Sequence, residues 1–285
     1  MVRRSPANSV LILYKESPLV SAGNASFHPE WRKRMKANHA RHYASLTFIE
    51  NVLKGAGLSF SKVRRGGAAT FPKVDLIVTV GGDGTLLEAV RRAGPGQRII
   101  GINSDPSWSV GRFCACDAPS FSPALSRLVP GKWRGTRLWR LCVRVSPGRK
   151  SFLVANDILI CHRNPAAMSR YEIFCQGRAE EQRSSGLWFS TAAGSTGAVL
   201  SAGGRRMPLA SPDVQFRARE LYRASGSGSC LAGGIVPRDR EVTVVSKMEQ
   251  GTIFIDGAHL REPFPYGHKV RILPAASYVE ILGVK

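Results

Sequence analysis

The pattern of hydrophobic and polar positions changes near the middle of the chain. In the first half, mostly apolar runs at 10–14, 58–63, 74–80 and 98–102 predict strands, the third of them buried in the centre of a sheet. Apolar residues at helical spacing predict a helix over 29–54, which ends at Gly55, and a second helix over 85–93. Strands that alternate with helices are typical of a doubly wound α/β domain, which we expect over residues 1–128.

The second half has short apolar runs separated by Gly, Pro and polar turns, and one helix signal, after Gly194. The predicted strands are 138–145, 152–160, 171–175, 187–190, 242–245, 252–255, 269–273 and 278–282. The Ser/Gly repeat at 225–229 predicts a mobile loop. Strands without intervening helices predict an all-β, sandwich-like domain over residues 129–285.

Composition and charge restrict the class of protein. Hydrophobic residues make up 43% of the 285 residues and charged residues 21%, which suits a globular chain. Lys and Arg outnumber Asp and Glu by 41 to 20, and the net charge of +21 favours anionic partners. No apolar run approaches the roughly 18 residues of a membrane span. The six cysteines include no CxxC pair, so we expect reduced thiols. The basic first residues lack the longer apolar core of a secretory signal, so we expect a cytoplasmic location by default.

The run Gly81-Gly-Asp-Gly-Thr85 is the most informative motif. Its glycines allow the backbone to approach a ligand closely, and the helix that follows offers N–H groups to an anion. A carboxylate within an anion site is costly unless it accepts a proton from a hydroxyl or holds a metal, so Asp83 is the candidate base. Neither the P-loop signature nor the GxGxxG fingerprint occurs in the chain.

Three polar motifs in the second half have both a structural and a functional interpretation. Asn156-Asp157 is a common turn dipeptide, but an amide beside a carboxylate also suits ribose hydroxyls or an adenine edge. The Gly194–Gly197 run fits a helix N-cap or a nucleotide contact, and Ser201 lies further along the same helix signal. Asp256-Gly257 fits a hairpin turn or a site residue.

Together these motifs resemble the NAD kinase family, in the family's order. The similarity also includes Gly101-Ile-Asn-Ser-Asp105, Gly111-Arg-Phe-Cys-Ala115, Ser190–Thr196 and Ser201–Gly204, and it is closest to the plant and mitochondrial branch. The resemblance implies an α/β domain followed by a β-sandwich, and transfer of the ATP γ-phosphate to the adenosine-ribose 2′-hydroxyl of NAD or NADH with Mg²⁺ or another divalent cation. It also implies a homo-oligomer, a dimer or a tetramer.

The resemblance implies a site shared by both domains. Asp83 would be catalytic. The nucleotide-binding residues would be Gly81, Gly82, Gly84, Thr85, Asn103, Asn156, Asp157, Thr191, Gly194, Ser195, Thr196, Gly197, Ser201 and Asp256.

The chain departs from the family pattern at three places. Gly197 and Ala198 stand where an Ala-Tyr pair is frequent, Phe113-Cys-Ala115 replaces Leu-Gly-Phe, and the C-terminal segment that often returns to the first domain is expected to be short or absent. Two alternatives remain open. A lipid kinase of the diacylglycerol or sphingosine type shares the Gly-Asp turn, and a basic nucleic-acid-binding protein would share the charge but not the motifs.

Overall fold

The computed structural model describes residues 9–21, 27–67, 71–128, 135–222 and 231–284, and it divides into two compact units. The first unit is residues 1–137 with 279–285, and the second is residues 138–278. The predicted mobile loop at 225–229 lies outside the described residues. Among the described residues, no helix is both long and apolar enough to cross a membrane.

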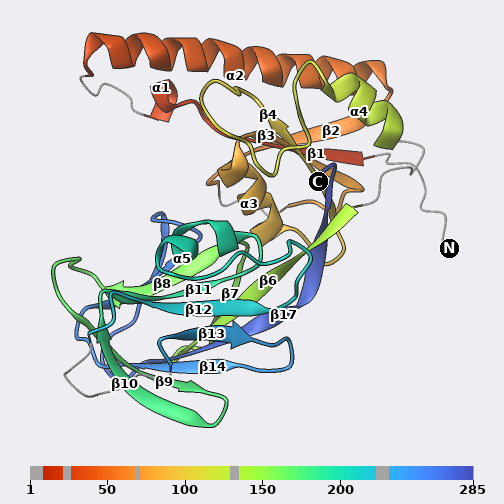
Figure 1. Ribbon diagram of the computed structural model, residues 1–285. Coiled ribbons are helices and arrows are strands. Elements are labelled where there is room, and N and C mark those ends of the chain that lie inside the picture. The colour runs from red at the N-terminus through yellow and green to blue at the C-terminus, as the bar shows by residue number, and fades with distance from the viewer. Residues whose placement is uncertain (1–8, 22–26, 68–70, 129–134, 223–230, 285) are drawn as a thin grey trace. The chain divides into compact units, whose positions relative to one another are not determined.

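The first unit is a parallel sheet with helices on both faces, as the alternating pattern predicts. Its elements are β1 (Ser9–Tyr14), α1 (Pro18–Ser21), α2 (Pro29–Gly55), β2 (Ser59–Arg64), β3 (Leu76–Gly81), α3 (Asp83–Arg92), β4 (Arg98–Asn103), β5 (Cys116–Asp117) and α4 (Phe121–Leu128). The strand order β4-β3-β1-β2 is parallel throughout, with α2 on one face and α3 on the other (Figure 1). Leu46, Ile49 and Leu53 of α2 pack on the buried strands, which fixes the strand ends that carry the polar motifs.

The end of the chain differs from expectation, because it does return to the first unit. The predicted strands at 269–273 and 278–282 form one strand, β17 (Lys269–Leu282). Its residues Glu280–Leu282 pair in parallel with Arg98–Ile100 of β4. Val279 and Ile281 are fully buried, so hydrophobic burial holds this short segment in place.

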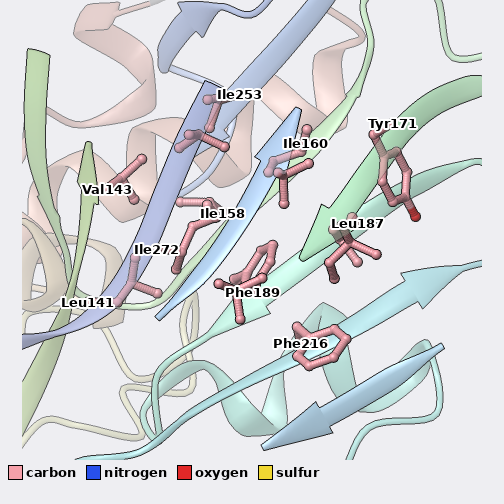
Figure 2. Close-up of a cluster of buried hydrophobic side chains, with 14 of the residues drawn as sticks. Leu141, Val143, Ile158, Ile160, Tyr171, Leu187, Phe189, Phe216, Ile253 and Ile272 are labelled. Carbon is pink, nitrogen blue, oxygen red and sulfur yellow. The ribbon is translucent and has the colours of Figure 1, made fainter. Parts of the chain in front are cut away.

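The second unit is an all-β sandwich. Its further strands are β6 (Gly135–Ser146), β7 (Lys150–Val154), β8 (Asp157–His162), β9 (Ser169–Cys175), β10 (Arg178–Ser184), β11 (Gly186–Ser190), β12 (Val214–Arg219), β13 (Gly233–Val236), β14 (Val242–Ser246), β15 (Gly251–Ile255) and β16 (Leu260–Pro263). One sheet has the order β13-β12-β11-β8-β15-β16, and the other contains β10-β9-β14-β17 with β6 and β7. Side chains from both sheets, such as Ile158, Phe189 and Ile272, form one apolar core (Figure 2).

Three expectations for the second unit are wrong in detail. The predicted strand 152–160 is interrupted at Ala155 and Asn156, whose N–H groups bond to Asp256 instead of to a neighbouring strand. The strands β10, β12, β13 and β16 were not predicted, because they are polar, glycine-rich or short. The helix signal after Gly194 yields only a 3₁₀ turn, η1 (Gly194–Thr196), and the four-residue α5 (Ala198–Ser201).

Candidate functional site

The glycine-aspartate turn connects the buried strand β3 to the first turn of α3. The protein's own packing favours glycine at 81 and 82, because a Cβ atom would displace a neighbouring side chain. It would lie 2.3 Å from Thr85 Oγ1 at the first position and 2.8 Å from Ser109 Oγ at the second. Gly84 is exposed. Thr85 is buried, and its Oγ1 has no hydrogen-bond partner among the described residues. The turn therefore presents backbone groups at Gly84, whereas the Thr85 side chain points back at Gly81.

Asp83 is the first residue of α3, and its carboxylate has a fixed orientation. Oδ1 accepts a hydrogen bond from the backbone N–H of Phe113 at 2.8 Å, and Oδ2 accepts one from Arg112 at 3.0 Å. An ionised carboxylate has about four acceptor positions, so each oxygen can accept a further hydrogen bond. The side chain is half-buried, and it lies at the positive end of a helix dipole. This arrangement suits a carboxylate that meets a hydroxyl near bound phosphate.

The loop that supplies these two N–H groups is shaped by Asn103. Asn103 Nδ2 donates to the Ser109 carbonyl at 2.9 Å, and Oδ1 accepts from the Asp105 N–H and the Ser109 hydroxyl. Gly111 adopts a φ of +64° directly against this amide, where a Cβ would lie 2.4 Å from Nδ2. Asn103 is thus the cross-strand partner of Gly81 in the glycine-aspartate turn, and its side chain organises the loop in this structure.

The same loop is anchored to helix α2 by Asp105, which the sequence did not single out. Asp105 is 1% exposed and accepts hydrogen bonds from Asn38 Nδ2 at 2.7 Å and Ser107 Oγ at 2.6 Å, and it forms an ion pair with Arg41 at 2.9 Å. Burial acts to raise the pKa of this carboxyl, but the bonds from Ser107, Asn38 and Arg41 together hold the pKa below its ordinary value. Asp105 is therefore a buried, ionised anchor.

A buried histidine completes the anchor. His42 Nε2 lies 2.8 Å from the Lys15 carbonyl oxygen, and Nδ1 lies 2.8 Å from Ser104 Oγ. Burial lowers the pKa of His42 to about 4, so the ring is neutral, Nε2 donates to the carbonyl and Nδ1 accepts from the hydroxyl. Ser45 Oγ also donates to the Ser104 carbonyl at 2.9 Å. The spacing of Asn38, His42 and Ser45 along one helix face was the available sequence signal.

In the second unit, Asp256 fixes the junction between β7 and β8. It lies in the turn after β15 with a φ of +48°. Its carboxylate accepts hydrogen bonds from the N–H groups of Asn156 at 2.7 Å and Ala155 at 3.0 Å, while its own N–H donates to the Asp157 carbonyl. The structure thus gives Asp256 the structural role that the sequence left open, next to the candidate ribose-binding pair.

Asn156 and Asp157 form a side-chain pair. Asn156 Nδ2 donates to Asp157 Oδ2 at 2.9 Å. Asp157 is 8% exposed, and burial, with a smaller contribution from the negative charge of Asp256, raises the pKa of Asp157 to about 7. A buried carboxylate with a displaced pKa at a polar junction is typical of a functional site.

The Thr191–Gly194 segment packs on this pair. Thr191 Oγ1 donates to the Ala155 carbonyl at 2.8 Å, and the Thr191 N–H donates to the Asn156 carbonyl at 3.0 Å. A Cβ on Gly194 would lie 2.3 Å from the Asn156 carbonyl oxygen, so only glycine fits there. The expected grouping of Asn156, Asp157, Thr191 and Gly194 is therefore present.

The later residues of that motif differ among themselves. Ser195 is fully buried, donates to the Ala192 carbonyl and accepts from the Met207 N–H, so its hydroxyl has internal partners. Thr196 is half-buried, and Gly197 is exposed at a position where a Cβ would lie 3.8 Å from Asp157 Oδ2. Ser201 is exposed at the end of α5. The structure thus brings Gly197 next to the buried carboxylate of Asp157.

The cysteines and acidic residues add no metal centre among the described residues. No group of three or more His, Cys, Asp or Glu side chains in those ranges could hold an ion. The described cysteines, Cys114, Cys116, Cys142, Cys161 and Cys175, are all free thiols, as expected.

Comparison with known proteins identifies the family. Residues 20–117 match the model of the ATP-NAD kinase N-terminal domain. The chain is 30% identical over 263 residues to the rice (Oryza sativa subsp. japonica) protein named "Probable NADH kinase", an alignment that covers 85% of this chain and 81% of the relative. This chain belongs to the NAD kinase family.

Two further comparisons agree with this membership in the NAD kinase family. The NADH kinase of Arabidopsis thaliana is 28% identical over 305 residues, with 93% of this chain and 91% of the relative covered. The crystal structure of yeast NADH kinase complexed with NADH has the same fold, with a TM-score of 0.74 at 16% identity over 98% of this chain and 84% of that chain. The predicted fold class is thereby confirmed for this member of the NAD kinase family.

Proposed function

We propose that this protein transfers the γ-phosphate of ATP to the adenosine-ribose 2′-hydroxyl of NAD or NADH. Membership in the NAD kinase family supports the reaction, and the names of the rice and Arabidopsis relatives favour NADH as one acceptor. The observation that carries the residue assignment is the carboxylate of Asp83, which is fixed by two N–H groups at the start of α3.

Asp83 would accept the proton of the 2′-hydroxyl. A free aspartate, with a pKa of about 3.9, is a weak base for an alcohol, but a loose phosphoryl-transfer transition state requires that proton only late. Orientation then matters more than basicity, and the two backbone bonds supply orientation. The N–H groups at the start of α3 would meet phosphate oxygens.

Asn156 and Asp157 would bind ribose hydroxyls. The amide can donate and accept hydrogen bonds, and the ionised carboxylate can accept hydrogen bonds from two hydroxyl groups. Thr191 and Gly194 hold the Asn156 backbone in place, and Gly197 leaves the side of Asp157 uncovered by a side chain.

A divalent cation would enter with ATP as its counterion. Mg²⁺ usually keeps several waters and binds through one or two carboxylates together with substrate phosphates. Asp83 retains acceptor capacity beyond its two N–H partners, so its carboxylate fits such an ion. Bound Mg²⁺ would neutralise charge on the transferred phosphate.

We also propose a homo-oligomer, a dimer or a tetramer, which light scattering on the purified chain would measure. We propose a cytoplasmic location as well, which cell fractionation would test.

The decisive experiment is Asp83→Asn, assayed with ATP and with NAD and NADH separately. Asparagine keeps the size of the side chain, and its one oxygen can accept one of the two N–H bonds. The fold and NAD binding should persist while kcat falls by about 10²- to 10⁴-fold. The exposed Asp239→Asn is the matched control and should retain full turnover. A kcat near the wild-type value for Asp83→Asn would refute the base assignment. Turnover of diacylglycerol in place of NAD(H) would refute the proposed acceptor.

A further inference from the structure

The second unit has a basic cavity that shares no residue with the candidate site. It has a volume of about 550 Å³ and lies where β6, β7, β14 and β17 run side by side. It is lined by Arg144, Val145, Ser146, Arg149, Ser151, Thr243, Lys269 and Arg271. Small-molecule sites have volumes of roughly 300–1,000 Å³, so this cavity is large enough for a ligand bigger than one phosphate.

Strand periodicity explains why cations gather in this cavity, which we term the basic cavity. Residues that alternate with Arg144, Thr243 and Arg271 along their strands are buried in the apolar core, for example Val143, Val244 and Ile272. Arg144, Thr243 and Arg271 therefore lie on the opposite, outer face of the sheet. Arg271 is the direct cross-strand partner of Thr243, and Arg144 is that of Ser151. Each of these two arginines thus has a hydroxyl-bearing residue as its cross-strand partner.

Four cations among the described residues line the cavity: Arg144, Lys269 and Arg271 lie on strands, and the fourth, Arg149, lies in the hairpin that joins β6 to β7. Val145 pairs with Lys150, so residues 146–149 form the connection. Arg149 adopts a φ of +53°, a left-handed conformation that is unfavourable for a residue with a side chain. In this conformation, Arg149 lies in the lining of the cavity.

Positive charge in the basic cavity is largely uncompensated. Within the described ranges, Arg271 is the one cation of the four with a carboxylate partner, Glu241, at 3.7 Å, and both side chains are about half exposed. On the neighbouring strand β9, Glu172 is the cross-strand partner of Val245 and does not line the cavity. Like charges held on neighbouring strands repel, so a bound polyanion would relieve a cost that the free protein carries.

We propose that the basic cavity binds a small oligophosphate, a chain of several linked phosphates, separately from the kinase substrates. Arginine guanidinium groups match phosphate oxygens two at a time, and the hydroxyls of Ser151 and Thr243 add neutral donors. Among the described residues of the lining, none has an aromatic side chain on which a nucleobase could stack. The cavity thus recognises phosphates rather than bases, so free polyphosphate and the triphosphate of a nucleotide are two sources of the same chemistry.

The test is calorimetric titration of the full chain with inorganic tripolyphosphate at constant ionic strength. The variant is Arg144→Gln combined with Arg271→Gln, which keeps exposed polar side chains and the core behind them. The control is Arg178→Gln combined with Arg183→Gln on β10, which removes the same charge from exposed positions outside the cavity. We expect the cavity variant to bind one tripolyphosphate fewer per chain, or to bind it at least tenfold more weakly, while the control matches the wild type. Kinase turnover with ATP and NAD(H) should stay within about twofold in both, so failure of this proposal and failure of the proposed function are separable.

Titrations with further ligands decide the chemical nature of the ligand. ATP should bind the basic cavity within a few-fold of tripolyphosphate, and orthophosphate far more weakly, because the cations are spread over several strands. Equal loss in the cavity variant and the control would mean general charge attraction and would overturn the proposal. Absence of any site that depends on Arg144 and Arg271 would also overturn it. A single-stranded oligonucleotide could bind more tightly than tripolyphosphate and with the same dependence on Arg144 and Arg271. That result would overturn the oligophosphate assignment and identify nucleic acid as the ligand.

Discussion

The raised pKa of Asp157 makes a quantitative prediction about stability. In the folded chain the pKa of this carboxyl is about 7, against an ordinary value of 3.8, because the side chain is buried beside Asp256. Between these values the folded state keeps a proton that the unfolded state has released. The unfolding free energy therefore falls as pH rises, by about 1.4 kcal/mol per pH unit. This contribution to stability is fully present below about pH 4 and is lost by about pH 7, a total of about 4 kcal/mol.

Asp157→Asn removes this dependence. The amide is neutral at every pH, and its oxygen can still accept the hydrogen bond from Asn156 Nδ2. We expect the variant and the wild type to have similar unfolding free energies near pH 4, and the variant to be more stable by up to about 4 kcal/mol at pH 8. Under the proposed function the same variant loses NAD(H) binding, so the carboxylate would be retained for ligand binding at a cost in stability.

Urea denaturation of both proteins at half-unit intervals from pH 4 to pH 8, followed by circular dichroism, measures this difference directly. Titrating groups remote from Asp157 act equally on both proteins, so the difference curve reports Asp157 together with Asp256, the charge that interacts with it. The exposed Asp239→Asn supplies the control and should run parallel to the wild type. If Asp157→Asn also runs parallel to the wild type over this range, the carboxyl titrates normally and the reasoning from its burial is wrong.

Three other predictions follow from particular contacts. Asp105→Ala should lower the unfolding free energy by about 3–5 kcal/mol, because it removes a buried ionised anchor. It should also reduce kcat, because the Arg112 and Phe113 N–H groups lose their position. Arg41→Gln alters only the half-exposed partner and should lower the unfolding free energy by about 1 kcal/mol or less. Gly194→Ala should destabilise the second unit and weaken NAD(H) binding, as measured by thermal melting with and without NADH, whereas Gly94→Ala, where a Cβ meets open space, should do neither. Removal of divalent cations with a chelator should abolish turnover, and excess Mg²⁺ should restore it; turnover that persists in the chelator would contradict the proposed role of the ion.

The sequence alone predicted the elements that arise from a pattern of neighbouring residues. Continuous apolar runs in β1, β3 and β4 are buried on both faces, and helical spacing located α2 to within a residue at its end. The Gly81–Thr85 run was recognisable because a glycine turn between a buried strand and a helix is itself a local arrangement. The same reasoning missed β10 and β12, whose polar residues become strands through pairing with neighbours rather than through their own pattern.

Tertiary structure alone decided which polar residues meet. Asp105 contacts Asn38 across 67 positions of the chain, and Asp256 holds the Asn156 N–H across 100. No periodicity encodes such pairs, because each is set by the packing of apolar surfaces elsewhere in its unit, which brings the strand ends and the helix face together. The same packing buries Asp157 and so displaces its pKa, a property that belongs to the environment of the carboxyl and not to the residue type. The sequence therefore named the chemical groups, and the folded chain decided which of them are anchors and which remain open to a ligand.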